Sequence, residues 1–416
     1  MTRTTQTALW MAAAATGIAG GVAGTALAQD ASGEISDGVV KIGILNDQSG
    51  VYADITGQGS VVAAEMAAEE FGGEVLGAPI EIVSADHQNK PDVGSAIARE
   101  WYATEDVDAI MDLTTSSVAL AVQGLSRDME KITIVTGAGT TELTGAQCSP
   151  FGFHWAYDTR ALSQGTAGSL AAEGADTWFF VTADYAFGDS LQNEATRVIE
   201  EAGGQVMGSV RHPLATTDFS SFMLQAQASG AAVVGLANAG LDTANAIKSA
   251  GEFGLTQSGQ RLAGLLFTLS EVHGLGAETA QGLNLTEGWY WDQSDENRTF
   301  AEAFMERHGA MPNSLQVGTY SAALQYLKAV EAAGTDATQA VADQLHQMPV
   351  EDVFAKSGTV QENGRMVFDM YLFEVKGPDE MEGEWDLYRE VATVPGEEAY
   401  ASVEESGCDV SSFASN

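Results

Sequence analysis

Positive charge is scarce in this chain. Of its 416 residues, 18 are Lys or Arg and 58 are Asp or Glu, which gives a formal net charge of −40. A surface of this sign repels phosphate backbones and anionic lipid headgroups, so the composition argues against a nucleic-acid partner. The acidic residues are spread along the chain rather than gathered in one block, and we expect them on a solvated surface.

Catalytic and metal-binding motifs are also missing from the sequence. It contains no G-x-S-x-G, no G-x-x-x-x-G-K, no G-x-G-x-x-G and no H-E-x-x-H. Its 6 histidines are scattered without the spacing of metal ligands. We therefore predict that the protein is not an enzyme, has no metal site and uses no cofactor.

Apolar runs are short, and the most apolar one lies near the start of the chain. Arg3 precedes an Ala- and Gly-rich stretch that ends near Gly24, and Ala-Leu-Ala follows at 26–28. A basic start, a short apolar stretch and an A-x-A end are typical of a secretory signal peptide. A retained membrane anchor, the alternative, needs about 20 apolar residues. We predict that residues 1–28 are a cleaved signal peptide and that the mature protein works outside the cytoplasm.

Cysteine is nearly absent, with only Cys148 and Cys408 in the chain. Two thiols in an exported protein pair more often than they stay free. The two readings, one disulfide or two free thiols, both remain open at this point.

Residues 39–59, VVKIGILNDQSGVYADITGQG, predict a strand, a polar loop and the start of a helix. The apolar residues at 39–45 are nearly continuous, as in strands that are buried on both faces of a parallel sheet. The loop contains Asp47 and Gly50, and an Ala-rich helix begins near Gly59. A strand that ends in such a loop before a helix is where open α/β sheets bind ligands.

Strands and helices then alternate in two series, which predicts an α/β fold with parallel sheets. The first series has strands near 39–45, 80–84, 109–113 and 132–136, with helices near 59–71, 92–103 and 117–128. The second has strands near 177–182, 205–210, 232–236 and 261–267, with helices near 160–173, 188–202, 218–229 and 242–253. Further helices are expected near 297–309 and 313–333, and hairpin strands near 358–376 and 385–394.

The order of several short motifs resembles the leucine/isoleucine/valine-binding family of periplasmic solute receptors. After the opening at 39–59 these are ADHQNKPD (85–92), TTSSVAL (114–120), VTGAGTTELT (135–144), TADYAFGDS (182–190) and the stretch from TTDFSSF to GLANAG (216–240). The resemblance covers nearly all of the chain after the leader. It implies a type I periplasmic binding protein, with two Rossmann-like lobes, central parallel sheets and a multi-strand hinge, that captures its ligand by lobe closure.

The resemblance also implies how the chain is divided. We expect the first lobe at 37–158 and 287–350, the second lobe at 159–286 and 351–395, and a loosely packed tail at 396–416. Receptors of this family often carry one cysteine before the first lobe crossing and another near the C-terminus. Cys148 and Cys408 fit that pattern, so a disulfide would tie the tail to the first lobe.

A ligand carboxylate is expected to bind in the first lobe. Ser116 and Ser117 precede a helical run, where hydroxyls and free backbone N–H groups can hold an anion without arginine. The resembled family uses such a serine loop and the loop that matches Thr136–Gly139, which implies Ala138 and Gly139. Plain helix capping by the serines, and a simple turn at the glycines, are the alternatives.

The remaining predicted ligand-binding residues follow other strand ends. The resemblance implies that the aromatic-Gly loop with Tyr185 and Phe187 closes over the ligand. We also include the loop residues Tyr52, His87, Asn238, Asp242 and Thr268. Tyr157 adds aromatic surface near the expected mouth of the cleft. Any single aromatic or histidine here could instead belong to the core or support a loop.

The predicted class of ligand depends on an acidic residue that is missing from one position. Family members that bind amino acids usually place an acidic residue after the strand that matches Leu265–Phe267, to neutralise the α-ammonium. Here Thr268 stands at that place, and Glu271 lies slightly beyond it. An unpaired buried ammonium is costly, and the chain also resembles the family branch that binds aromatic carboxylates. We predict a small aromatic acid, with branched-chain or other amino acids as the alternative.

The partners follow from the resemblance. It implies a monomeric receptor that passes its small carboxylate ligand to an ABC permease of the inner membrane through transient contact, and it implies a periplasmic location. A ligand sensor of the same fold is the alternative. The sequence contains no recognisable kinase or DNA-binding segment, and this favours transport.

Overall fold

The first predicted strand lies inside a six-stranded sheet. The structure is a computed structural model that describes residues 1–2 and 35–415, so the predicted signal peptide lies almost wholly outside the described residues. Strand β1 (Val40–Asn46) pairs in parallel with β3 and β4, and its apolar side chains are fully buried. The sheet order is β2-β3-β1-β4-β5-β6. The other strands are β2 (Glu74–Val75), β3 (Ala78–Asp86), β4 (Ala109–Asp112), β5 (Ile132–Val135) and β6 (Gly152–His154).

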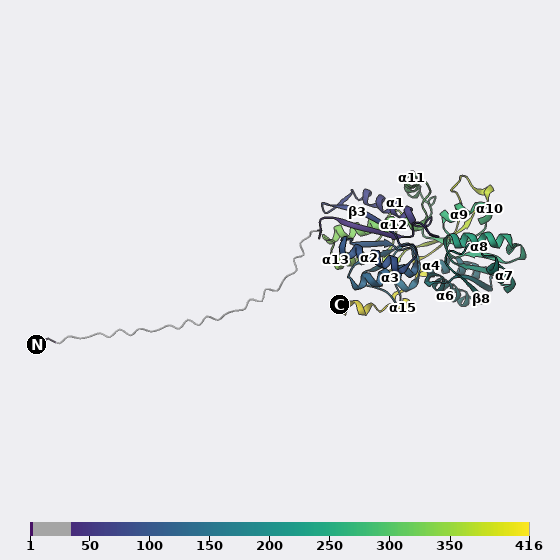
Figure 1. Cartoon of the computed structure of the whole chain (residues 1–416), viewed down its shortest axis with the longest axis horizontal. Helices are drawn as coiled ribbons and strands as arrows, with labels where there is room; N and C mark the ends of the chain where they lie inside the picture. Colours follow the sequence, from purple (N-terminus) through teal and green to yellow (C-terminus); the bar gives the residue numbers. More distant parts are fainter. Residues whose placement is uncertain (3–34, 416) are drawn as a thin grey trace. The chain divides into compact units, whose positions relative to one another are not determined.

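Six helices accompany this sheet and complete what we call the first lobe (Figure 1). Helix α1 packs against α12 and α11, α2 packs against α3, and α12 packs against α13. Two of these pairs join segments more than 200 residues apart, so the first lobe is discontinuous in sequence. The helices are α1 (Gly57–Glu70), α2 (Pro91–Thr104), α3 (Ser116–Asp128), α11 (Asp295–His308), α12 (Ser314–Ala333) and α13 (Thr338–Gln347).

A four-stranded parallel sheet in the order β10-β9-β7-β8 forms the centre of the second lobe. Its strands are β7 (Thr177–Ala183), β8 (Gln205–His212), β9 (Val233–Ala237) and β10 (Arg261–Gly264). Its main helices are α6 (Ala186–Glu201), α7 (Ser220–Ser229) and α8 (Gly240–Glu252). Strand β10 is three residues shorter than the predicted strand, because the chain leaves the sheet after Gly264 and Leu266 turns toward a cavity.

The helix predicted at 160–173 is interrupted. It consists of α4 (Thr159–Leu162), a π-helical turn (Ser163–Ala167) and α5 (Gly168–Ala172). At Gly165 the backbone comes so close to the next sheet that a Cβ would lie 2.2 Å from Thr286 Oγ1. The π-helical turn therefore lies where the helix packs most closely against Thr286.

A small antiparallel sheet, in the order β11-β14-β15, lies beside the second lobe and contacts β10 and the π-helical turn. Glu287, at the end of β11, joins both lobes: its carboxylate accepts hydrogen bonds from the Leu269 amide (3.1 Å) and from Ser314 Oγ (2.7 Å). The elements are β11 (Asn284–Glu287), β14 (Met370–Val375), β15 (Tyr388–Val394), the short pair β12 (Thr359–Val360) and β13 (Met366–Val367), and the helices α9 (Leu269–Leu275) and α10 (Ala277–Ala280).

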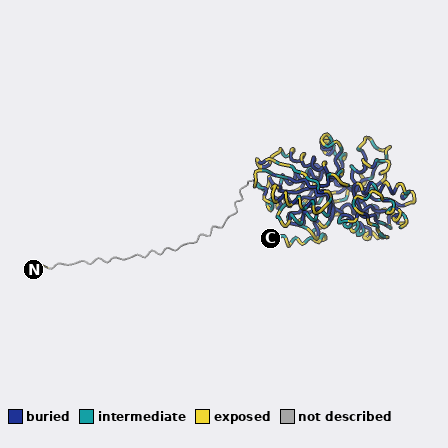
Figure 2. Tube along the Cα trace, in the orientation of Figure 1, coloured by how far each residue is buried: buried dark blue, intermediate teal, exposed yellow. Residues whose placement is uncertain are grey.

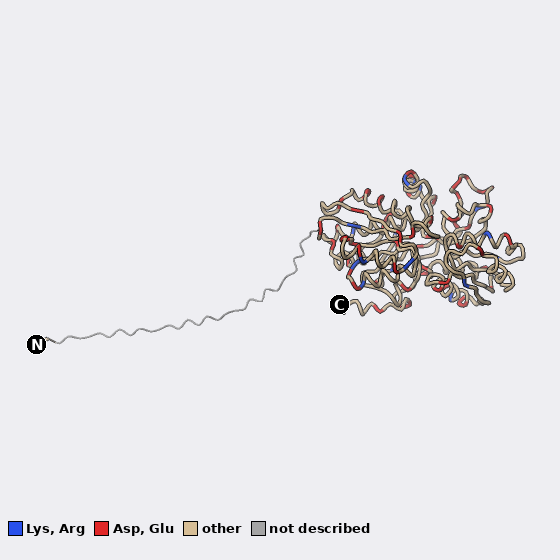
Figure 3. The backbone as a smooth tube through the Cα atoms, viewed as in Figure 1, with Lys and Arg blue, Asp and Glu red and all other residues tan. Residues whose placement is uncertain are grey.

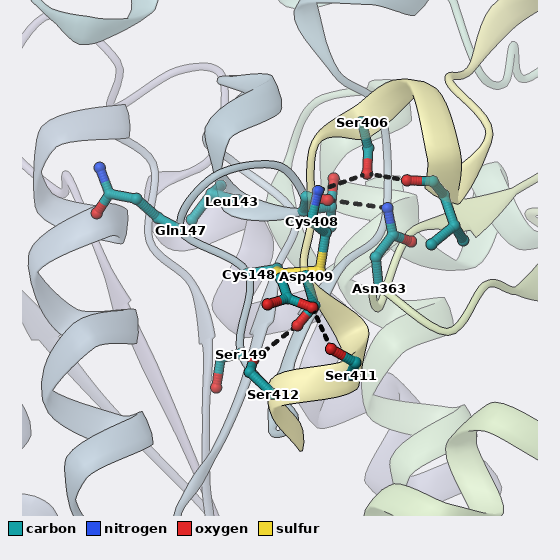
Figure 4. The surroundings of a disulfide bond; sticks show 12 residues. Leu143, Gln147, Cys148, Ser149, Asn363, Ser406, Cys408, Asp409, Ser411 and Ser412 are labelled. Atoms are coloured by element: carbon teal, nitrogen blue, oxygen red, sulfur yellow. Dashed lines mark hydrogen bonds between the residues drawn. A yellow bond between two sulfur atoms is a disulfide. The ribbon is translucent and has the colours of Figure 1, made fainter. Parts of the chain in front are cut away.

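The C-terminal tail was expected to be loosely packed, and for its first part this is wrong. Helix α14 (Gly396–Ala399) is followed by Tyr400, whose side chain is 2% exposed. The prediction failed because the segment is rich in Gly and Glu overall, and its composition gives no sign that the single residue Tyr400 is buried in the core. After α15 (Val403–Ser406), Cys408 forms a disulfide with Cys148 of the first lobe (Figure 4), as the resemblance implied.

Burial and charge are distributed as the sequence predicted. Buried residues follow the strands and the inner faces of the helices in both lobes (Figure 2). Acidic residues are scattered along the described chain in both lobes, with the few Lys and Arg among them (Figure 3), although some, such as Asp112, Asp242 and Glu287, are buried. Repulsion is therefore distributed over the surface and not concentrated at one site.

Candidate ligand-binding site

A small cavity lies where strand ends of both lobes meet. Its volume is about 10 Å³, roughly the space that one water molecule occupies. Residues that follow β1, β4 and β5 line it from the first lobe, and residues that follow β7, β9 and β10 line it from the second. The lining consists of Tyr52, Ile55, Thr114, Gly137, Tyr157, Tyr185, Phe187, Ala239, Leu266 and Leu315.

The two lobes touch each other directly at this cavity. Tyr52 Oη and Tyr185 Oη are 2.6 Å apart, and the Leu241 amide donates to the Val51 carbonyl at 3.2 Å. Gly240 approaches the same loop so closely that a Cβ would lie 2.4 Å from the Val51 oxygen. A ligand larger than water can enter only when these contacts separate, which requires that the lobes open.

Unused backbone donors lie in the two first-lobe segments that directly follow the lining residues Thr114 and Gly137. Within the described part of the chain, the amides of Ser116 and Ser117, in the first turn of α3, have no acceptor, and neither have those of Ala138 and Gly139. The Thr140 amide donates to Ser116 Oγ at 3.3 Å and so holds the two loops together. The positive end of the helix dipole adds to these donors. This arrangement can hold a carboxylate.

Buried carboxyl groups lie near the tyrosines of the cavity. The pKa of Tyr157 is raised, first by burial and then by nearby groups that include Glu271. The pKa of Tyr52 is also raised, first by burial and then by Tyr185 and Asp242. Glu271 Oε2 accepts from the Thr268 amide at 2.8 Å, whereas its Oε1 has no partner among the described residues. Burial raises the pKa of Glu271 to about 8, so this group is mostly protonated at pH 7.

Only some of the predicted ligand-binding residues come together at the cavity. Tyr52, Tyr185 and Phe187 line it. Gly139 lies directly behind the lining, since a Cβ there would be 2.6 Å from the Tyr157 ring and 3.0 Å from the Phe187 ring. Together with Ser116, Ser117 and Ala138, these residues form one contiguous region, and their roles in binding stay predictions.

Four further predicted residues are buried, and they lie outside both the lining and this contiguous region. The His87 ring accepts from the Asn89 amide at 3.0 Å. The Asn238 amide bonds His212 (3.0 Å) and accepts from Thr243 (2.7 Å), both within the second lobe. Thr268 begins α9. Asp242 accepts from the Ala215 amide at 3.1 Å, and its second oxygen has no partner in the described chain.

Several residues that line the cavity were not predicted from the sequence. Leu315 belongs to α12, nearly 270 residues after β1, and no local signal marks it. Ile55, Ala239 and Leu266 are ordinary apolar residues whose type alone predicts burial in a core. The loop positions of Ile55 and Ala239, next to predicted strand ends, were the one available signal.

Stability should fall as the pH rises above 6.5. Burial raises the pKa of Asp108, Asp112, Asp242 and Glu287, each to about 7, and of Glu271, to about 8; it also raises the pKa of Asp158 and Asp352. Because these pKa values exceed the unfolded ones, the folded state holds extra protons at every pH between the two, and their stabilising effect is lost progressively from about pH 4 until the pH has passed the folded pKa values. Each proton released costs about 1.4 kcal/mol per pH unit.

Below pH 6.5 buried histidines oppose this trend. Burial lowers the pKa of His87 to about 4, so the stability that its neutral ring contributes is lost as the pH falls from 6.5 toward 4. Calorimetric Tm values between pH 5 and 8.5 should therefore decline most clearly above 6.5. The Glu271→Gln variant should decline less, and a rising Tm from pH 6.5 to 8 would contradict the assignment.

The described residues contain a second hollow, but they contain neither a metal-binding cluster nor a membrane-spanning helix. A larger hollow of about 760 Å³ lies against α1, α11 and α12, away from the strand ends, and its lining is rich in charged side chains such as Glu69, Glu296 and Arg307. Three or more His, Cys, Asp or Glu residues placed to hold a metal ion are not found in the described chain. Within the same range, every helix is too short or too polar to cross a membrane.

Comparison with known proteins gives consistent matches. The family model described as "Periplasmic binding protein" matches residues 39–380. A Leu/Ile/Val-binding protein homolog 6 from Brucella melitensis is 30% identical over 316 residues, which cover 73% of this chain and 79% of that protein.

Solved structures agree with this. A periplasmic binding protein from Burkholderia mallei is 47% identical, with a TM-score of 0.88, and the match covers 90% of this chain and 99% of that one. A solute-binding protein of an ABC transporter from Rhodopseudomonas palustris, in complex with p-hydroxybenzoic acid, is 26% identical, with a TM-score of 0.76 and coverage of 86% and 97%.

Proposed function

Because this chain belongs to the periplasmic binding protein family, the solute receptors of ABC transporters, we propose that its own ligand is a small aromatic carboxylate. Members of this family are binding proteins and not enzymes, in line with the missing catalytic motifs. The observation that carries the proposal is a cavity lined by four aromatic residues, next to first-lobe segments whose backbone amides at Ser116, Ser117, Ala138 and Gly139 have no acceptor in the described chain.

The proposed ligand matches the chemistry of this region, which has to widen by opening of the lobes before the ligand can enter. Its carboxylate accepts hydrogen bonds from the amides around Ser117 and Gly139, where the helix dipole favours negative charge. Its ring inserts between Tyr52 and Tyr185 after their hydroxyl contact separates, and packs against Phe187. A protonated Glu271 can donate a hydrogen bond to a polar substituent on the ring. The likeness to the receptor with bound p-hydroxybenzoic acid supports this class of ligand.

An amino acid is the second candidate, and one observation favours it. Glu271 Oε1 lacks a partner among the described residues, and an α-ammonium placed there would ionise the carboxyl group and pair with it. The relative named as a Leu/Ile/Val-binding homologue supports this reading. The two candidates differ in the expected charge of Glu271: neutral with an aromatic acid, ionised with an amino acid.

Calorimetric titration separates the two. Benzoate- and cinnamate-type acids should bind with micromolar or lower Kd, whereas leucine, isoleucine and valine should give no heat. Phe187→Ala should weaken aromatic binding by at least the 0.5–1.5 kcal/mol that ring packing contributes, about 2- to 13-fold in Kd. Binding of leucine alone, abolished in Glu271→Gln, would overturn the aromatic assignment.

Replacement of a serine hydroxyl in the donor region should weaken binding without abolishing it. In Ser117→Ala or Ser116→Ala, loss of a hydrogen bond to a charged group costs about 1.5–3 kcal/mol, roughly 13- to 160-fold in Kd. The backbone donors remain, so binding should not vanish. Ser126→Ala, in the same helix but at its other end, is the control. Unchanged Kd in both site variants would move the carboxylate elsewhere.

Location, partner and lobe boundaries complete the proposal. The family implies work outside the cytoplasm, and we propose export through a signal peptide cleaved after Ala28, which the N-terminal mass of the mature protein would test. The receptor acts as a monomer and hands its ligand to an ABC permease. Its first lobe comprises 37–158 and 287–350, and its second lobe comprises 159–286 and 351–395.

A further inference from the structure

The C-terminal tail is anchored first on the second lobe. Helix α14 packs against α4 and the π-helical turn, and the Gly396 amide donates to Asp369 at 2.9 Å. The Tyr400 hydroxyl lies 3.0 Å from Met370 Sδ on β14. The Tyr400 ring lies 4.4 Å below the guanidinium of Arg365, which itself binds the Trp155 and Tyr157 carbonyls at the crossing from the first lobe. A buried aromatic with these partners cannot shift without disrupting the core around it.

Eight residues later the same tail is attached to the first lobe. Cys408 is bonded to Cys148, which lies in the loop between β5 and β6 (Figure 4). Gln123 of α3 holds this loop, since its Nε2 donates to the carbonyls of Leu143 and Gln147, each at 2.9 Å. At Gly145 the tail passes so close that a Cβ would lie 2.8 Å from the Ser406 oxygen. The second anchor is therefore covalent and rests on a braced loop.

The stretch between the two anchors is folded into a short coil. The Glu405 amide donates to Ser402 Oγ (3.3 Å), and the Ser402 amide donates to Glu405 Oε2 (3.1 Å). The same Glu405 oxygen lies 3.3 Å from Arg160 Nη2, on α4 of the second lobe. This ion pair is partly exposed and therefore weak. The coil can open without loss of any core contact.

We propose that residues 401–408 form a strap that limits how far the two lobes can separate. A fully extended chain spans at most about 3.3–3.6 Å per residue, so the eight steps from Tyr400 to Cys408 reach roughly 26–29 Å. The helical turn α15 shortens the strap, because a helix advances only about 1.5 Å per residue. As the lobes part, the Arg160–Glu405 pair and the turn are lost first, and the extended strap then stops the motion.

This inference depends on the proposed opening of the lobes but not on the identity of the ligand. A strap that excludes wide-open conformations reduces the conformational freedom lost on closure. The disulfide would thus act on the native protein's range of motion, in addition to its effect on the unfolded chain. A disulfide that only stabilises the first lobe would leave the range of opening unchanged.

The test uses a longer strap that keeps the disulfide. Six Gly/Ser residues are inserted after Ala401, and the same insert after Gly383, in an exposed loop, serves as the control. Spin labels on keto amino acids at Asp92 (α2) and Gln225 (α7), both exposed, report the distance between the lobes without any added cysteine or ligand. A third variant, Cys148→Ser with Cys408→Ser, removes the covalent anchor.

The lengthened strap and the double Ser variant should both broaden the ligand-free distance distribution toward longer values, whereas the control insert should match the unmodified protein. Thermal unfolding of each variant shows whether it is folded. If the lengthened strap gives the unmodified distribution, the proposal is wrong, even if the double Ser variant broadens. Failure of aromatic acids to bind would overturn the proposed ligand and leave this result untouched.

Discussion

Gly240→Ala is expected to weaken ligand binding about 5- to 150-fold. The new Cβ would lie 2.4 Å from the Val51 oxygen and 2.8 Å from the Tyr52 ring, both across the contact between the lobes. Such overpacking typically costs about 1–3 kcal/mol, and here the cost falls on the closed arrangement alone, because open lobes do not bring these atoms together. Calorimetric titration with benzoate-type acids would measure the change in Kd.

A matched control separates closure from backbone strain. Gly240 has φ +65°, and Gly230 has φ +67° with no heavy atom within 4 Å of an added Cβ. Gly230→Ala therefore carries the same left-handed strain without the contact between the lobes. Both variants should lower Tm to a similar extent, but only Gly240→Ala should lose affinity. Equal affinities would mean that the lobes do not close in this manner around a ligand.

Arg365→Met is expected to destabilise the protein by about 3–5 kcal/mol, the usual cost of leaving a buried charge without its partner. Arg365 is 1% exposed and donates to the carbonyls of Trp155 (2.5 Å), Tyr157 (2.8 Å) and Met366 (2.8 Å). Its guanidinium also lies 3.8 Å from the Asp158 carboxylate. Methionine would fill similar space but would leave these carbonyls without their donor and the Asp158 carboxylate without its ion-pair partner.

Denaturant unfolding would measure this loss, and an exposed arginine provides the control. Arg389 pairs with Glu374 and Glu380 on the surface, so Arg389→Met should change stability little. Addition of Asp158→Asn to Arg365→Met should recover part of the loss, because the uncompensated carboxylate is removed. An unchanged free energy of unfolding in Arg365→Met would show that the buried pair is dispensable.

The alternation of strands and helices could be read from the sequence almost throughout. Strand β1 was visible because nearly all its residues are apolar, and α1 because Val62, Met66 and Ala67 recur at helical spacing. The interrupted helix at 159–172 was not visible, because its π-helical turn meets Thr286 more than 100 residues away. The spacing of apolar residues predicts which face of a helix is buried, but it does not predict the shape of the segment that packs against that face.

The candidate site was only partly predictable, for the same reason. Tyr52, Tyr185 and Phe187 line the cavity and were identifiable because they are aromatic and lie in loops at strand ends. His87 and Asn238 occupy equivalent loops, yet His87 Nδ1 and the Asn238 side-chain amide bond neighbours inside their own lobes. Loop position predicts nearness to the cleft, whereas the side-chain direction depends on the local hydrogen bonds.

The sequence by itself determined the α/β architecture and the position of the first-lobe loops that carry backbone donors. It also determined the acidic composition of the chain and the absence of the catalytic motifs named above. These depend on local pattern and composition, which the linear order of residues contains. Only the tertiary structure decided that the buried Arg365 binds the carbonyls of Trp155 and Tyr157, that Leu315 lines the cavity and that the tail contacts both lobes. Each of these joins residues far apart in the chain, and their mutual distance is set by packing, which no local pattern encodes.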